Sequence, residues 1–303
     1  MRVAAVDLGT NSTRLLVADV EDGRLAELDR RLTITRLGEG VDSRRRLLPL
    51  PIARVRNCLA DYRRAAEAHD AERVLAIGTS AVRDAENGDA FLGEIEWSYG
   101  FATRLLSGDD EARLTWRGVT AGRELAPGTL IVDVGGGSTE LIAEGFHASL
   151  DAGCVRMTER HGEDLDALDA AASTLLAPIV VRPDKLIGVA GTVSTLAMLD
   201  LGLAAYERDQ VHGHVLTAEA VDEQLRRLAS LPLSERRELP GLEPDRAPVI
   251  VAGAAIVRAV LRHFGLDEIE QSEQDILDGA ALAAAELPEP VEGDAPPGAY
   301  TCC

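Results

Sequence analysis

Lysine is nearly absent from this chain, because Lys185 is the only lysine among 31 basic residues. A P-loop needs a lysine next to a serine or threonine in its glycine-rich turn, but Lys185 follows Pro183 and Asp184. The sequence therefore excludes a Walker-type nucleotide hydrolase. It also excludes a protein kinase, which needs a strand lysine beside a glycine-rich loop.

Cysteines are few and have no metal-ligand spacing: Cys58, Cys154, Cys302 and Cys303. We therefore expect neither a zinc site nor a disulfide framework. No apolar run approaches the roughly 18 residues of a membrane span. An acid at Asp7 comes too early for a signal peptide. These absences predict a soluble, cytoplasmic protein that has no membrane partner.

The 51 acidic residues outnumber the 31 basic ones, and the resulting net charge of −20 argues against a general nucleic-acid partner. Nucleic acids and anionic membranes reward basic surfaces, so any anionic substrate must be held locally here. With 303 residues and 46% apolar content, the chain is long enough for one large or two medium domains with ordinary cores.

Two similar turns stand out against this background. Each follows an apolar run rich in strand formers, begins with an acid and is followed by a second apolar stretch. The turns comprise residues 7–12 and 133–139. Their glycines permit close approach to a phosphate, and their N–H groups and hydroxyls can bind its oxygens. An acid at each strand end, Asp7 or Asp133, can hold a divalent cation against those oxygens.

The remaining pattern predicts alternating strands and helices. We expect strands at 29–35, 74–77 and 186–190, and helices at 52–66, 165–177, 248–264 and 275–286. Acids in 109–111 suit the first turn of a helix. The small-residue turn 191–195 opens another helix, where an anion could bind. Composition beyond Leu287 predicts a disordered tail.

The ordered set of motifs resembles the exopolyphosphatase and guanosine pentaphosphate phosphohydrolase family (Ppx/GppA). These motifs occur in family order at 6–12, 36–42, 79–85, 107–113, 133–140, 153–159, 188–192, 211–213 and 272–279. The resemblance covers residues 1 to about 282.

The resemblance implies an α/β chain with the actin-like, ribonuclease-H-like fold, in which two duplicated domains close on a phosphate cleft. We expect domain I at 1–124, domain II at 125–287 and the tail at 288–303, with the last helix, about 275–287, packing back on domain I. Longer relatives append a helical C-terminal region that this chain lacks, so we expect less surface for long polyphosphate. Family members often dimerise, which makes a homodimer an expected state.

The resemblance also assigns site residues. Glu111 matches the proposed catalytic base, and Glu140 and Arg83 complete the catalytic set, Arg83 because a guanidinium fits phosphate oxygens bidentately. Metal-binding acids are Asp7, Asp133 and Glu140, for Mg²⁺ or another divalent cation. Phosphates would be bound by Gly9, Thr10, Asn11, Ser12, Gly135, Gly136, Gly137, Ser138 and Thr139. Arg14 and Arg156 are further basic candidates.

Each of these residues also has a structural interpretation. Glu111 could be a first-turn helix acid, and Asp7 and Asp133 could close their own turns by Asx hydrogen bonds. His212 and His214 stand two apart without a third ligand, so we assign no metal to them. Gly135 to Gly137 do not form a dinucleotide motif, because a strand rather than a helix follows them.

The leading hypothesis is a magnesium-dependent hydrolase that releases orthophosphate from the end of inorganic polyphosphate. The alarmone pppGpp is the alternative substrate, since the same turns would accept its terminal anhydride. A catalytically weak sensor of either molecule is a third reading. Phosphotransfer from ATP is a fourth, because sugar and acetate kinases share the fold.

Overall fold

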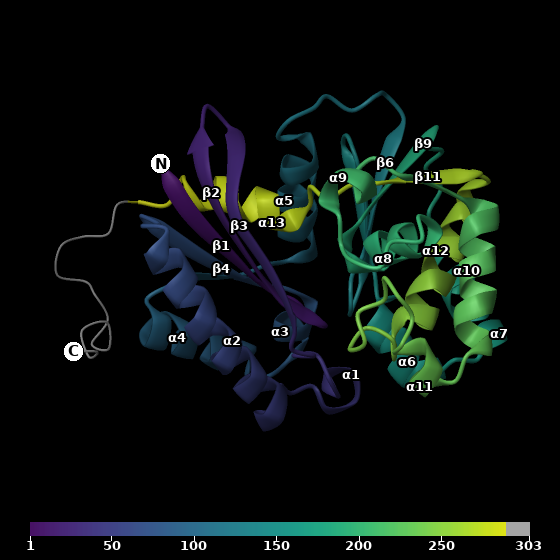
Figure 1. Ribbon diagram of the computed structural model, residues 1–303, viewed down its shortest axis with the longest axis horizontal. Coiled ribbons are helices and arrows are strands. Elements are labelled where there is room, and N and C mark those ends of the chain that lie inside the picture. The colour runs from purple at the N-terminus through teal and green to yellow at the C-terminus, as the bar shows by residue number, and fades with distance from the viewer. Residues whose placement is uncertain (289–303) are drawn as a thin grey trace. The chain divides into compact units, whose positions relative to one another are not determined.

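The computed structural model describes residues 1–288 and divides into two compact units (Figure 1). Unit 1 is Met1–Arg123 together with the chain from Asp275 onward, and unit 2 is Glu124–Gln274. The predicted tail, apart from Pro288, lies outside the described residues, as do Cys302 and Cys303.

Unit 1 contains a five-stranded sheet with helices on both faces. Its elements are β1 Arg2–Leu8, β2 Ser12–Glu21, β3 Arg24–Ile34, α1 Val41–Arg44, α2 Pro49–Ala68, β4 Arg73–Gly78, α3 Ser80–Asp84, α4 Gly88–Tyr99, β5 Ala102–Leu105, α5 Gly108–Thr120 and α13 Ile276–Ala284. The strand order is β3-β2-β1-β4-β5.

The alternation along β1 explains the two faces of this sheet. Ala4, Val6 and Leu8 pack with the buried residues of α2 and α4. Val3 and Ala5, which point to the other face, pack with α5 and α13. A strand buried on both sides reads as a continuous apolar run, as β1 does. Asp7 shares the parity of Val3 and Ala5, so it faces α13.

Unit 2 contains a six-stranded sheet, in the order β10-β11-β9-β6-β7-β8. Its elements are β6 Thr129–Val134, β7 Thr139–Ala143, β8 Phe146–Leu150, α6 Cys154–His161, α7 Leu165–Leu176, β9 Lys185–Val189, α8 Ala190–Asp200, α9 Arg208–Val211, β10 Val215–Thr217, α10 Ala218–Ser230, α11 Leu233–Arg236, α12 Ile250–Phe264 and β11 Glu268–Gln271. Leu130, Val132 and Val134 of β6 enter the core that α7, α8, α10 and α12 share.

The two sheets repeat one topology. In each, the first strand pairs antiparallel with the second and parallel with the fourth, and the second pairs antiparallel with the third. The parallel row continues from β4 to β5 in unit 1 and from β9 to β11 in unit 2. Strand β10 extends the second sheet by an antiparallel pair. The shared order, β3-β2-β1-β4-β5 in unit 1 and β8-β7-β6-β9-β11 in unit 2, is the predicted ribonuclease-H-like, actin-like architecture.

Local predictions differ from the structure mainly in extent. Strand β3 begins at Arg24, five residues before the expected 29, because it pairs along the whole of β2. Helices α4 and α10 and strands β8, β10 and β11 were not predicted from the pattern. No helix within residues 1–288 is both long and apolar enough to cross a membrane.

Candidate active site on two phosphate turns

The turns at residues 7–12 and 133–139, which we call the first and second phosphate turns after their expected ligand, close with the same backbone hydrogen bond. The Gly9 N–H donates to the Ser12 carbonyl at 3.0 Å, and the Gly135 N–H donates to the Ser138 carbonyl at 3.0 Å. In Gly9 an added Cβ would lie 2.8 Å from the Ser12 carbonyl oxygen, so only glycine fits there. The repeated geometry shows that the duplication extends from the strand order to the turns themselves.

The turn of unit 1 is supported by the segment that follows β3. The Asn11 carbonyl accepts hydrogen bonds from the Thr35 and Arg36 N–H groups at 3.1 and 2.8 Å, and the Gly38 N–H donates to the Thr10 carbonyl at 2.8 Å. A Cβ on Gly38 would come within 2.2 Å of the Thr10 side chain. Within residues 1–288, the buried Asn11 amide has no hydrogen-bond partner, which leaves its donors and acceptor for a ligand.

The turn of unit 2 is supported by the start of α6. The N–H groups of Cys154 and Val155 donate to the Gly135 and Gly136 carbonyls at 3.0 and 2.8 Å. The buried Arg156 donates through Nε to the Gly137 carbonyl at 2.6 Å. These bonds give a structural reason for the motif at 153–159. Arg156 stabilises the turn through the Gly137 carbonyl.

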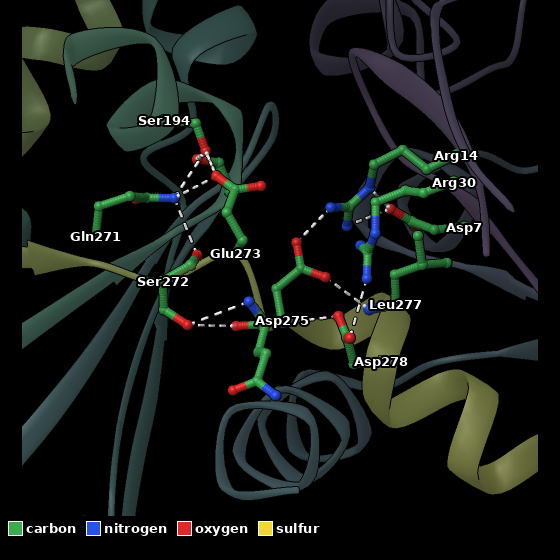
Figure 2. Close-up of polar contacts among 12 residues, drawn as sticks. Asp7, Arg14, Arg30, Ser194, Gln271, Ser272, Glu273, Asp275, Leu277 and Asp278 are labelled. Atoms are coloured by element: carbon green, nitrogen blue, oxygen red, sulfur yellow. Dashed lines mark hydrogen bonds and ion pairs between the residues drawn. The ribbon is translucent and has the colours of Figure 1, made fainter. Parts of the chain in front are cut away.

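In unit 1 the turn acid is paired with an arginine (Figure 2). Arg14, the register partner of Asp7, donates Nε and Nη2 to Asp7 Oδ2 at 2.9 and 2.8 Å. It also donates Nη1 to Asp275, the N-cap residue of α13. Burial raises the pKa of Asp7, and Arg14 opposes that rise. Asp7 Oδ1 is buried and has no hydrogen-bond partner within the described chain.

A second arginine, Arg30, also bonds to an acid of α13. Arg30 donates Nη2 to Asp278 at 3.0 Å, and Figure 2 shows it beside the Arg14 group. Burial acts to raise the pKa of Asp275, but Arg14 and Arg30 outweigh it and hold that pKa below its usual value. Asp7 therefore does not close its own turn by an Asx bond; it is one end of a buried charge network.

In unit 2 the turn acid faces another acid. Asp133 and Glu140 are direct register partners on β6 and β7, and both are buried. Glu140 accepts a hydrogen bond from the Ser149 hydroxyl at 3.0 Å. Like charges directly opposite each other in a sheet repel, so this pair favours a cation.

The acid pair of unit 2 matches what magnesium requires. Mg²⁺ is usually bound by one or two carboxylates, with water and substrate phosphates completing its shell. No group of three His, Cys, Asp or Glu side chains clusters into a metal site in the described part of the chain. A site made of the Asp133–Glu140 pair, shared with substrate, fits both facts.

Glu111 and its neighbour Asp110 have separate tasks. Ser107 and Asp110 form a capping box at the start of α5, with the Asp110 N–H bonded to the Ser107 hydroxyl at 3.2 Å. Glu111 takes no part in that cap. It is buried, and it accepts a hydrogen bond from Arg83, which also donates to the Leu106 carbonyl at 2.9 Å. The predicted base is thus held by the predicted arginine.

Arg246 is a candidate anion-binding residue that the sequence pattern did not suggest. It is buried, and an added Cβ on Gly191 would lie 2.2 Å from its guanidinium, at the first turn of α8. A guanidinium beside a helix N-terminus favours an anion. The crowding at Gly191 is the signal that could have located it, but it is visible only in three dimensions.

The two histidines have separate structural contacts. His212 Nδ1 accepts from the Glu273 N–H at 3.1 Å, while His214 Nε2 lies 2.7 Å from Asp200 Oδ2.

The chain is similar in sequence to proteins that cleave phosphoanhydrides. The Ppx/GppA phosphatase family profile matches residues 16–284. Exopolyphosphatase 2 of Mycobacterium tuberculosis is 37% identical over 316 aligned residues, which cover 94% of this chain and 98% of that protein. The guanosine-5'-triphosphate,3'-diphosphate pyrophosphatase of Photobacterium profundum is 30% identical, over 88% of this chain and 56% of that protein.

Solved structures agree with this similarity. The Ppx/GppA family member of Aquifex aeolicus is 28% identical, with a TM-score of 0.79 over 94% of this chain and 98% of that one. A protein described as exopolyphosphatase-like is 30% identical, with a TM-score of 0.85 over 93% of this chain and 98% of that one.

Proposed function

Because the chain belongs to the Ppx/GppA phosphatase family, we propose that it is an exopolyphosphatase, which hydrolyses the terminal phosphoanhydride of inorganic polyphosphate. The observation that carries this proposal is the buried pair of acids, Asp133 and Glu140, at the end of a phosphate turn. Such a pair suits a cation shared with a phosphate.

The hydrolysis needs three groups: donors for the phosphate oxygens, a charge that neutralises the transferring phosphoryl group, and a residue that orients water. Gly9 to Ser12 and Gly135 to Thr139 supply the donors through their N–H groups and hydroxyls. The Asn11 amide, buried without a partner in residues 1–288, adds a further donor.

Water activation belongs to Glu111 in this proposal. Its carboxylate is buried and held by Arg83, so it keeps one orientation. A fixed carboxylate can accept the proton of a water molecule as that water attacks phosphorus in line. Arg83 would then have two roles: it orients Glu111, and its guanidinium would bind phosphate oxygens.

Magnesium is the proposed cofactor, and Asp133 and Glu140 would hold it. When bound, it would neutralise charge on the phosphate oxygens that it shares with these residues. Asp7 of unit 1 stays a predicted ligand, and Arg14 already neutralises it through Oδ2.

Hydrolysis of pppGpp is the second candidate. It is favoured by the similarity to the Photobacterium profundum enzyme, whose name specifies that substrate class. The same turns and acids would act on its terminal anhydride, and the difference would lie in the surface that meets the guanosine.

The test is orthophosphate release by the purified protein, with Mg²⁺, from tripolyphosphate, long-chain polyphosphate and pppGpp in parallel. Faster release from either polyphosphate supports the exopolyphosphatase, and faster release from pppGpp moves the assignment to the alarmone. If none is hydrolysed but one binds tightly, the protein is a sensor. If transfer to an added acceptor exceeds release, it is a phosphotransferase.

A further inference from the structure

Three consecutive arginines, Arg44 to Arg46, are exposed at the end of α1. None of their guanidinium groups has an ion-pair partner within the described residues, whereas buried arginines such as Arg14 and Arg236 are paired. In a chain with a net charge of −20, three adjacent cations without acidic partners form a local reversal of sign. We call residues 44–46 the arginine triplet.

The triplet is held in place at both ends. On its N-terminal side, the Val41 N–H donates to the Gly38 carbonyl at 3.0 Å, and Gly38 is bonded to Thr10 of the phosphate turn. On its C-terminal side, the Leu47 N–H donates to Asn87 Oδ1 at 2.9 Å, and the Asn87 amide donates back to the Leu47 carbonyl at 3.2 Å. The position of the triplet is therefore fixed relative to the first phosphate turn.

The triplet also adjoins the helix that carries Arg83. The Arg45 carbonyl accepts a hydrogen bond from the Glu86 N–H at 2.8 Å, and α1 contacts α3, as the neighbouring labels in Figure 1 show. Arg44 lies over the start of its own helix: its Cδ and Nε lie 3.7 and 3.9 Å from the point where Gly40, four residues earlier, would carry a Cβ. The backbone of the triplet is thus bonded to the chain on both sides of the loop, after β3 and after α3.

The backbone at Arg45 provides an independent observation. Its φ of 52° is left-handed, at the C-cap position of α1, where glycine is the usual residue. An arginine there carries backbone strain that glycine would relieve. Strain of this kind is retained where the side chain has a use.

We propose that the arginine triplet binds internal phosphates of a polyphosphate chain whose terminal phosphate occupies residues 9–12 of the first phosphate turn. The inference rests on the proposed function, and it adds a determinant of chain length to it. A long polyphosphate carries a negative charge at each phosphate and bends freely, so successive phosphates can meet successive guanidinium groups. We expect a tripolyphosphate, which has only three phosphates, to bind at the turn and not to reach the triplet.

The physical consequence concerns binding rather than chemistry. Contacts to distant phosphates lower KM for long chains and leave kcat unchanged, because they are the same in the ground and transition states. Since the triplet is exposed, added salt screens its effect more strongly than it screens the buried turns.

The experiment compares wild type with R44Q/R45G/R46Q, in which glycine suits the left-handed position. The matched control is R226Q/R227Q/R237Q, which removes three exposed arginines from unit 2. We expect the triplet variant to raise KM for long-chain polyphosphate about tenfold, roughly the effect of a few exposed charge contacts, with kcat and the values for tripolyphosphate unchanged. The thermal midpoint should not fall.

Direct binding of long-chain polyphosphate to each protein is measured by calorimetry at low and high salt. Weaker binding by the triplet variant alone supports the proposal. An equal loss of polyphosphate binding in the control variant would show that only total charge matters, and it would overturn the proposal. An unchanged ratio of the long-chain KM to the short-chain KM in the triplet variant would also overturn it. If the wild type hydrolyses neither polyphosphate, the proposed function fails, and the calorimetric comparison still decides whether the triplet binds the polymer.

Discussion

The two phosphate turns have the same backbone hydrogen bond, but they differ in the residue that lies opposite the acid on the next strand. In unit 1, Asp7 faces Arg14, whereas in unit 2, Asp133 faces Glu140. Both turns close with the same 3.0 Å hydrogen bond. The acid of the first turn is therefore paired with an arginine of the neighbouring strand, whereas the acid of the second lies opposite another acid.

This difference separates two tasks that the sequence pattern treats alike. A turn whose acid is paired with arginine can bind phosphate without a strong demand for metal, while a turn with two facing acids cannot stay ionised at low cost without one. We therefore propose that the first turn of the duplicated pair binds phosphate and that the second also binds the metal. The following predictions test that division, beginning with the largest expected effect.

Converting the second turn into the first should abolish the metal site. In E140R, an arginine opposite Asp133 would neutralise it as Arg14 neutralises Asp7. We expect hydrolysis to fall roughly 10⁴-fold, since a bound metal contributes several kcal/mol to the transition state. Mg²⁺ should raise the thermal midpoint of wild type but not of E140R. An unchanged magnesium response in E140R would show that the metal binds elsewhere.

In the proposed mechanism the group that activates water is Glu111 of α5, which belongs to neither turn. We expect E111Q to lower kcat by roughly 10³-fold while substrate still binds, because the change removes a base and leaves both turns intact. The control is D110N, which disturbs the capping box and costs about 1 kcal/mol of stability with little change in kcat. Single-turnover rates and calorimetric binding separate the two. Full activity in E111Q would remove Glu111 from the mechanism.

Removing the arginine of the first turn should leave two buried acids without their partner. We expect R14Q to lose about 3–5 kcal/mol of unfolding free energy, measured by urea denaturation. R30Q breaks the neighbouring bridge to Asp278, which does not touch Asp7, and serves as its control. Only R14Q should also weaken binding of tripolyphosphate. Equal binding by R14Q and R30Q would make Arg14 a stabilising residue alone.

The smallest effect is on the acid side of the stability curve. Because the pKa of Asp275 is held below its usual value in the folded chain, its ionised form stabilises the fold above the ordinary carboxyl pKa. This contribution is lost as pH falls through the depressed value. D275N should be less stable than wild type at neutral pH, and the difference should shrink as pH falls. A constant difference would contradict the shift.

The family and the fold could be predicted from the sequence, and both predictions are confirmed. Ordered motifs identified the Ppx/GppA family, which its profile and the 37% identical relative bear out. The resemblance to that family implied the fold, and the two similar sheets and the related solved structures bear it out. The domain limits and the roles of the site residues stay predictions.

Other features could not be predicted because they depend on distant contacts. Arg14 is separated from Asp275 by 261 positions, and no local period links the two. Arg246 and Gly191 are 55 positions apart, and the guanidinium lies beside Gly191 only because unit 2 is folded. The facing of Asp133 and Glu140 was within reach, because the short turn between them fixes the register.

The contact between Arg14 and Asp275 sets an order of events during synthesis. The first turn leaves the ribosome early, but the residue that completes its charge network comes just before α13. Until that helix has formed, Arg14 can pair with Asp7 alone, and the outer part of the network has no second acid. A growing chain therefore carries an early turn whose charge network is completed only by its last helix.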